Sequence, residues 1–70
     1  MSLAAFPIGT RVRVVRIERD VDAAYAGLVG LLGTVTAHED PYLDVVIDGS
    51  RASPYDKGWL LLPDEVEVAP

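Results

Sequence analysis

The sequence predicts a single all-β domain in which five short strands wrap into a small, partly open barrel. Several short segments alternate between apolar and polar residues with a period of two, which is the pattern of half-buried strands. Glycine and proline separate these segments. The chain has 70 residues, of which 50% are hydrophobic and 24% charged. This length supplies one hydrophobic core and not two, so we expect one domain over residues 1–70 with its packed part at about 8–69.

The first strand is predicted at residues 11–17, after the proline and glycine that open it. Val12 and Val14 face the core in this strand. The apolar residues that follow break the alternation, so we expect a bulge or bend near Val14 and Val15. Such a bend is typical of a strand that wraps around a small barrel.

Residues 18–32 show no alternation and are predicted to form a long loop. A helical turn over residues 21–26 would end at Gly27, because glycine costs about 1 kcal/mol inside a helix. Alternation returns at residues 34–38, the second strand, where His38 faces outward.

The turn-forming residues 39–42 connect this strand to an antiparallel third strand at 43–48. A loop then runs to a fourth strand at 59–62. A single turn at 63–65 precedes a short closing strand at 66–68. Asp44, Val46 and Asp48 are assigned to the outer face of the third strand. The predicted core consists of Val12, Val14, Val35, Leu43, Val45, Ile47, Leu61 and Val66.

Four segments carry a resemblance to known proteins over about residues 8–69: the run from Gly9 to Arg16, Gly30-x-x-Gly33-x-Val35, Leu43-x-Val45-x-Ile47-Asp48, and Asp64 to Val68. The chain resembles small SH3-like barrels, and among them the electron-transport accessory proteins, which include the peripheral SH3-like subunit of photosystem I and the variable chain of ferredoxin-thioredoxin reductase. It is more weakly similar to the β subunit of nitrile hydratase and to KOW-type domains. The resemblance implies an SH3-like barrel with a long first loop and a one-turn 3-10 break before the last strand. It also implies an accessory subunit that docks on a larger assembly.

Charge is distributed unevenly along the chain, whose formal net charge is −5. Four of the six basic residues lie in the first 35 positions, and eight of the eleven acidic residues lie in the rest. The basic cluster is Arg11, Arg13, Arg16 and Arg19. A basic strip favours polyanions, but its acidic neighbours favour a solvated face of ion pairs. Nucleic-acid binding by a KOW-like domain through Arg11, Arg13 and Arg16 is therefore the alternative function.

Gly30 and Gly33 have a KOW-like spacing, but glycine also supplies the positive φ that a loop needs where it enters a strand. The acidic residues around His38 are predicted to lie in a turn and need not converge on a metal ion. The chain has no cysteine and one histidine, so no catalytic nucleophile with its base is evident. We expect no enzyme activity, no metal, no cofactor and no small-molecule substrate.

Aromatic and leucine side chains supply the other candidate contacts. Tyr42, Tyr55 and Trp59 invite comparison with the aromatic groove of peptide-binding SH3 domains, but the paired tryptophans and the Ala-Leu-Tyr-Asp-Tyr segment of that groove are missing. Trp59 is better placed as a packing residue. The fourth strand has apolar side chains on both faces, and only one face can contact the core. The pair on the other face, either Trp59 and Leu61 or Leu60 and Leu62, therefore needs a second segment to cover it. The long loop around Tyr25 supplies that cover, or a partner protein does.

These observations favour a non-catalytic docking or accessory module that binds a larger protein or a second copy of itself. No signal peptide is apparent, and the longest uncharged stretch, residues 23–37, is too short and too rich in glycine to span a membrane. We therefore expect a cytoplasmic protein that binds no membrane. The candidate partner-binding residues are Arg11, Arg13, Arg16, Tyr25, Tyr42, Tyr55, Trp59, Leu60 and Leu62.

Overall fold

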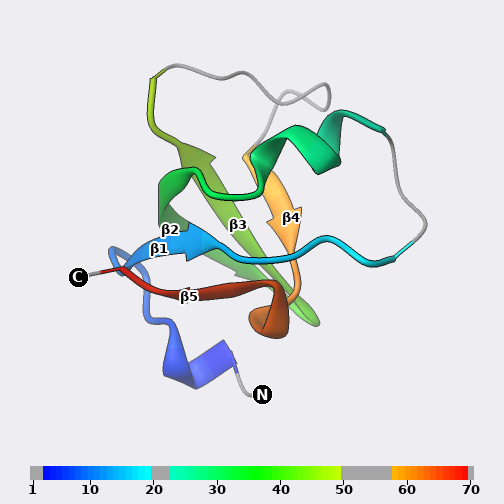
Figure 1. Ribbon diagram of the computed structural model, residues 1–70. Helices are drawn as coiled ribbons and strands as arrows, with labels where there is room; N and C mark the ends of the chain where they lie inside the picture. Colours follow the sequence, from blue (N-terminus) through cyan, green and yellow to red (C-terminus); the bar gives the residue numbers. More distant parts are fainter. Residues whose placement is uncertain (1–2, 20–22, 50–57, 70) are drawn as a thin grey trace.

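The computed structural model describes residues 3–19, 23–49 and 58–69. Five antiparallel strands form one sheet in the order β4-β3-β2-β1-β5 (Figure 1). The strands are β1 (Arg11–Val14), β2 (Leu32–Glu39), β3 (Tyr42–Ile47), β4 (Trp59–Leu61) and β5 (Val66–Val68). The predicted all-β fold with five strands is confirmed, and the sheet is open, with β4 and β5 at its two edges.

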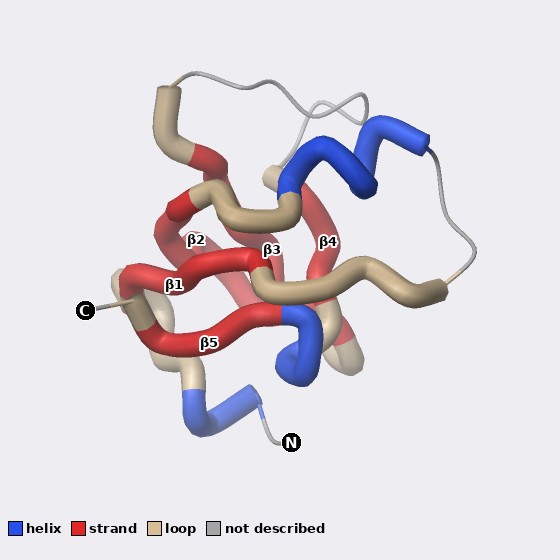
Figure 2. Tube along the Cα trace, viewed as in Figure 1, coloured by secondary structure: helices blue, strands red, loops and turns tan. Residues whose placement is uncertain are grey.

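The helical segments of the described residues are short 3-10 turns, one before the first strand and the others between strands (Figure 2). They are η1 (Leu3–Ala5), η2 (Ala23–Leu28) and η3 (Pro63–Glu65). The turn η2 lies inside the long first loop, and η3 is the predicted one-turn break before β5. In the described part of the chain, no helix has the length and apolar character needed to cross a membrane.

β1 ends at Val14, where the sequence predicted a bulge or bend, and does not continue to position 17 as predicted. Val14 still exchanges backbone hydrogen bonds with the end of the first loop, and its N–H donates to Leu31 O at 3.0 Å. The next two N–H groups, of Val15 and Arg16, donate to Glu65 O at 2.8 and 3.4 Å. A shift in register between Val35 and Ala37 places a second irregularity in β2, which the sequence did not predict.

The core contains all eight apolar side chains predicted for it, each no more than 2% exposed. Four further side chains complete it: Phe6, Tyr25, Leu28 and Trp59. Phe6 precedes β1, and its carbonyl oxygen lies 2.8 Å from His38 Nε2. A carbonyl oxygen only accepts, so His38 donates this hydrogen bond to the segment before β1. The packed unit therefore includes residues before position 8.

Asp44 corrects the predicted pattern of β3, because it is buried and not on the solvated outer face. It pairs with Ala37, directly after the register shift in β2, and with Leu60 of β4 on its other side. The backbone at Gly58 also passes close to it: a Cβ at position 58 would contact the Asp44 carboxylate and lie 2.8 Å from Val45 O. The alternation of buried and exposed residues fails here because the backbone at Gly58 covers this side chain.

A cleft between the first loop and the last 3-10 turn

Arg19 and Glu65 connect the first loop to η3 through a two-pronged ion pair. Arg19 Nε donates to Glu65 Oε2 at 2.8 Å, and Arg19 Nη2 donates to Glu65 Oε1 at 2.9 Å. The Glu65 side chain is only 5% exposed, so its charge depends on these partners. The N–H of Leu62 adds a third hydrogen bond to the same carboxylate, at 2.8 Å. The ion pair therefore fixes the conformation of the turn from which β5 starts.

The same guanidinium reaches the edge of the sheet. Arg19 Nη2 donates to Leu60 O of β4 at 2.7 Å, which joins residues 15–19 to the edge strand beside which they pass (Figure 1). The guanidinium carbon lies 5.4 Å from the ring centroid of Tyr25 and 5.2 Å from that of Tyr42, within cation-π distance. Hydrogen bonding to Glu65 is the main cause that raises the pKa of Arg19 above its ordinary value. Arg19 therefore links the first loop, β4 and η3.

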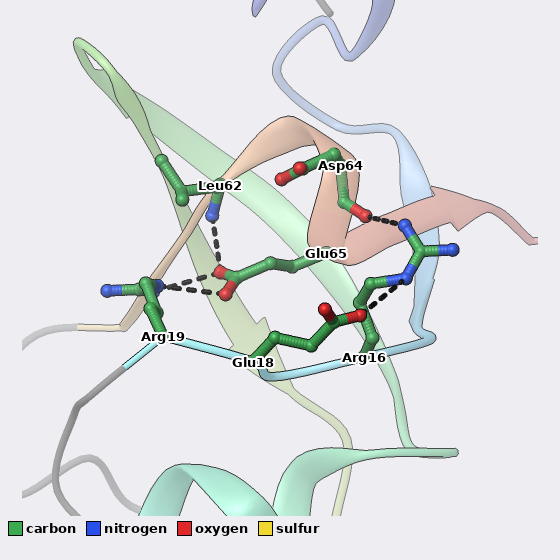
Figure 3. Close-up of a pocket in the computed structure, with 6 residues that line it drawn as sticks. All are labelled: Arg16, Glu18, Arg19, Leu62, Asp64 and Glu65. Carbon is green, nitrogen blue, oxygen red and sulfur yellow. Dashed lines mark hydrogen bonds and ion pairs between the residues drawn. The ribbon is translucent and has the colours of Figure 1, made fainter.

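An open cleft of about 460 Å³ lies beside this ion pair (Figure 3). Arg16 spans part of it: its Nη1 donates to Asp64 O at 2.6 Å, and its Nε lies 3.5 Å from Glu18 Oε1. These outer groups are exposed, with 52% of the Arg16 side chain and 79% of the Glu18 side chain accessible. We call this region the loop-turn cleft, lined by Arg16, Glu18, Arg19, Leu62, Asp64 and Glu65.

The first two residues of the predicted arginine strip lie outside this cleft, on the outer face of the sheet. Arg11 donates from Nη1 to Thr34 Oγ1 and to Asp48 Oδ1, both at 2.8 Å, and forms a second contact with the same carboxylate through Nη2. These hydrogen bonds lower the pKa of Asp48 and raise that of Arg11. Arg13 Nη1 lies 3.5 Å from Glu67 Oε1 of β5.

Each of the four arginines in the predicted basic cluster therefore has an acidic partner. The pairs of Arg11, Arg13 and Arg16 are exposed, as expected for a solvated face, but the Arg19–Glu65 pair is largely buried.

Two of the aromatic candidates are buried in the core and not on the surface. Tyr25 and Trp59 are buried at 4% and 2% exposure, and their rings meet edge to face with centroids 5.0 Å apart. The sequence predicted that these two residues contact a partner. Their burial contradicts that prediction, because the first loop packs Tyr25 onto Trp59 and removes both side chains from solvent. Tyr42 is half-buried beneath Arg19. Tyr55 lies outside the described residues.

The leucines of the fourth strand divide between the two faces. Trp59 and Leu61 face the core, where Trp59 packs against Tyr25 of the first loop, so Leu60 and Leu62 are the pair for which the sequence predicted a second cover. Leu60 and Leu62 remain half-buried, and Leu62 lines the loop-turn cleft. Of the predicted contact residues, Arg16 and Leu62 are the two that meet in this cleft.

The two glycines with KOW-like spacing have different structural roles. Gly30 lies where the first loop enters β2 and has a φ of +91°, a backbone conformation that residues with a side chain rarely adopt. Gly33 is needed for a close approach, because a Cβ there would lie 2.7 Å from Val46 O. Backbone geometry accounts for both positions.

The acidic residues considered as metal ligands are dispersed. Asp48 faces Arg11, Asp44 is buried on β3, and His38 bonds to the Phe6 carbonyl. Over residues 3–19, 23–49 and 58–69, no three His, Cys, Asp or Glu side chains gather in a way that suits a metal ion.

Sequence reasoning missed Glu18, Arg19, Asp64 and Glu65 as residues of one site. The spacing of Leu62 and Glu65 did carry a signal. An acid three residues after the residue that precedes a helical turn is typically placed to accept a hydrogen bond from the backbone N–H of that residue. Nothing local indicated that Arg19, 46 positions earlier, would be its partner.

In comparisons with known proteins, no family model, no curated protein and no solved structure matches this chain.

Proposed function

We propose that this protein is a non-catalytic docking module that binds another protein through the loop-turn cleft and the adjoining edge of β4. The observation that carries the proposal is the cleft itself. It combines a half-buried leucine, Leu62, with exposed charged groups on Arg16 and Glu18. An apolar contact beside a polar, solvated rim is the composition of a protein-protein contact region.

The rigidity of the cleft supports the same proposal. Its two walls, the first loop and η3, are joined by the Arg19–Glu65 ion pair and by the backbone hydrogen bonds from Val15 and Arg16 to Glu65 O. A partner that binds such walls does not have to order them first, which lowers the entropic cost of association.

Photo-crosslinking tests this proposal. A photoreactive phenylalanine derivative at position 62 places the probe in the cleft, and the same derivative at position 46 places it on the outer face of β3, where Val46 is 50% exposed. Irradiation in cells of the native host is expected to give a discrete protein adduct from position 62 and none from position 46. A second copy of this chain would be recognised by an adduct of twice the monomer mass formed by the purified protein. Equal adducts from both positions, or no protein adduct from position 62, would contradict the proposal.

The alternative, a KOW-like nucleic-acid module, has a distinct signature. Binding by phosphate contacts weakens steeply with salt. For duplex DNA, the logarithm of the binding constant falls with the logarithm of the salt concentration, with a slope of about −0.9 per neutralised phosphate. Arg11, Arg13 and Arg16 are each engaged with an acidic side chain, so we expect weak or no binding to DNA or RNA even at low salt. Measurable affinity with a steep salt slope that is lost in the variant Arg11→Glu would favour the alternative.

A further inference from the structure

The loop-turn cleft carries more negative than positive charge. Its lining has three carboxylates, on Glu18, Asp64 and Glu65, against two guanidiniums, on Arg16 and Arg19. Arg19 is paired with Glu65, so the outer part of the cleft is left with one guanidinium, on Arg16, and two carboxylates, on Glu18 and Asp64. Arg16 binds the backbone oxygen of Asp64, and within the described residues the Asp64 carboxylate forms no ion pair.

The two ion pairs of the cleft differ in how easily they exchange. Arg19 and Glu65 are 23% and 5% exposed and share two hydrogen bonds. Arg16 and Glu18 are separated by 3.5 Å and are largely in water, where an ion pair exchanges readily with solvent or another ion. Arg16 also keeps its 2.6 Å hydrogen bond to Asp64 O when its contact with Glu18 opens. The Glu18 carboxylate is therefore available to an incoming cation while the wall of the cleft stays in place.

We propose that the loop-turn cleft accepts a lysine or arginine side chain from an extended basic segment of the partner, and that Arg16 is its internal competitor. This inference rests on the proposed docking function. Glu18 from the first loop supplies the carboxylate that the incoming cation contacts, Asp64 of η3 adds negative charge on the other wall, and Leu62 contacts the alkyl part of the incoming side chain. Figure 3 shows the Glu18 carboxylate turned toward Arg16. The formal net charge of −5 favours the approach of a basic segment over an acidic one.

The experiment is an NMR titration of the ¹⁵N-labelled protein with two synthetic peptides, acetyl-Ala-Arg-Ala-Arg-Ala-amide and its counterpart with glutamate in place of arginine. The arginine peptide is expected to shift the amide signals of residues 16–18 and 62–65, and the glutamate peptide to leave them unchanged. Shifts centred instead on the exposed acids of the β2–β3 turn, Glu39 and Asp40, would show attraction to surface charge alone and would overturn the inference. Absence of binding by the arginine peptide would also overturn it.

Two matched pairs of variants separate local recognition from total charge. Arg16→Gln and Arg13→Gln change the net charge equally, but only the first removes the competitor in the cleft. We expect Arg16→Gln to tighten binding of the arginine peptide about 3- to 10-fold, the effect of one charge at contact distance near a surface. Arg13→Gln should change it less than about 2-fold, since its charge lies farther away and is screened. Equal effects of the two variants would refute the role of Arg16.

The carboxylates are tested in the same way. Glu18→Gln should weaken the arginine peptide about 3- to 10-fold, and Glu67→Gln on the outer face should not. Both side chains are exposed, so neither change threatens the fold.

The outcomes also distinguish this inference from the proposed function. A cross-link from position 62 without binding of the arginine peptide would leave a docking site of other chemistry. Peptide binding without any protein cross-link would leave a cation site without a docking function.

Discussion

Replacing Arg19 by methionine should destabilise the protein strongly, because it removes the cationic partner of a buried carboxylate. Methionine keeps the apolar stem against Tyr25 and Tyr42 but leaves the Glu65 carboxylate, 5% exposed, with only the N–H of Leu62. Breaking a fully buried ion pair costs about 3–5 kcal/mol, and because Arg19 is itself 23% exposed we expect about 2–3 kcal/mol. A core of this size supplies only about 3–5 kcal/mol in all, so most of the stability would be lost.

Urea unfolding followed by fluorescence measures this loss, because the single tryptophan, Trp59, is buried against Tyr25. The matched control is Arg13→Met, which breaks an ion pair whose side chains are 43% and 54% exposed, and which should cost at most about 1 kcal/mol. The double variant Arg19→Met with Glu65→Gln should cost less than the sum of the two single changes, since each already removes the shared interaction. If Arg19→Met costs no more than Arg13→Met, the reasoning is refuted.

Three other predictions concern packing, backbone geometry and pH. Ile47→Ala should cost about 2–5 kcal/mol and leave the protein largely unfolded by circular dichroism, whereas Val46→Ala on the outer face should remain folded. Gly33→Ala should lower the thermal midpoint because the new methyl group meets Val46 O across the sheet, and an unchanged midpoint would show that the strands separate without cost. Asp48 has a lowered pKa in the fold, so its stabilising contribution is present above the unfolded pKa of about 3.9 and is lost as pH falls through the folded pKa. The stability advantage of the wild type over Asp48→Asn should therefore be larger at about pH 5 than at about pH 2, and an advantage independent of pH would contradict this assignment.

The strands were predictable because their signal is local. Val12 and Val14, or Val45 and Ile47, reveal a buried face by spacing alone, and the structure places all four in the core. The alternation fails at Asp44, because its burial depends on the close approach of Gly58, which a period of two cannot express.

The candidate site was predictable only in part, because its geometry depends on contacts between distant segments. Arg16 and Leu62 were chosen for charge and for apolar excess, and both line the cleft. The sequence did not predict Glu65 as a site residue because an acid in a turn normally faces water. Its burial follows from Arg19, which local patterns treated as one more residue of a solvated strip.

Arg16 and Arg19 lie in one loop but differ in burial, and this difference separates the structural ion pair from the proposed contact site. Arg19 loses most of its contact with water and gains two hydrogen bonds to Glu65 and one to Leu60 O, so exchanging these partners for a ligand would expose a buried carboxylate and cost stability. Arg16 lies three residues earlier, remains half in water, and shares a longer contact with an exposed carboxylate. An incoming cation therefore competes with Arg16 at little cost and with Arg19 at a cost close to the stability of the fold. In the proposed docking function, this asymmetry would leave recognition to the outer rim of the cleft and keep the inner ion pair as its support.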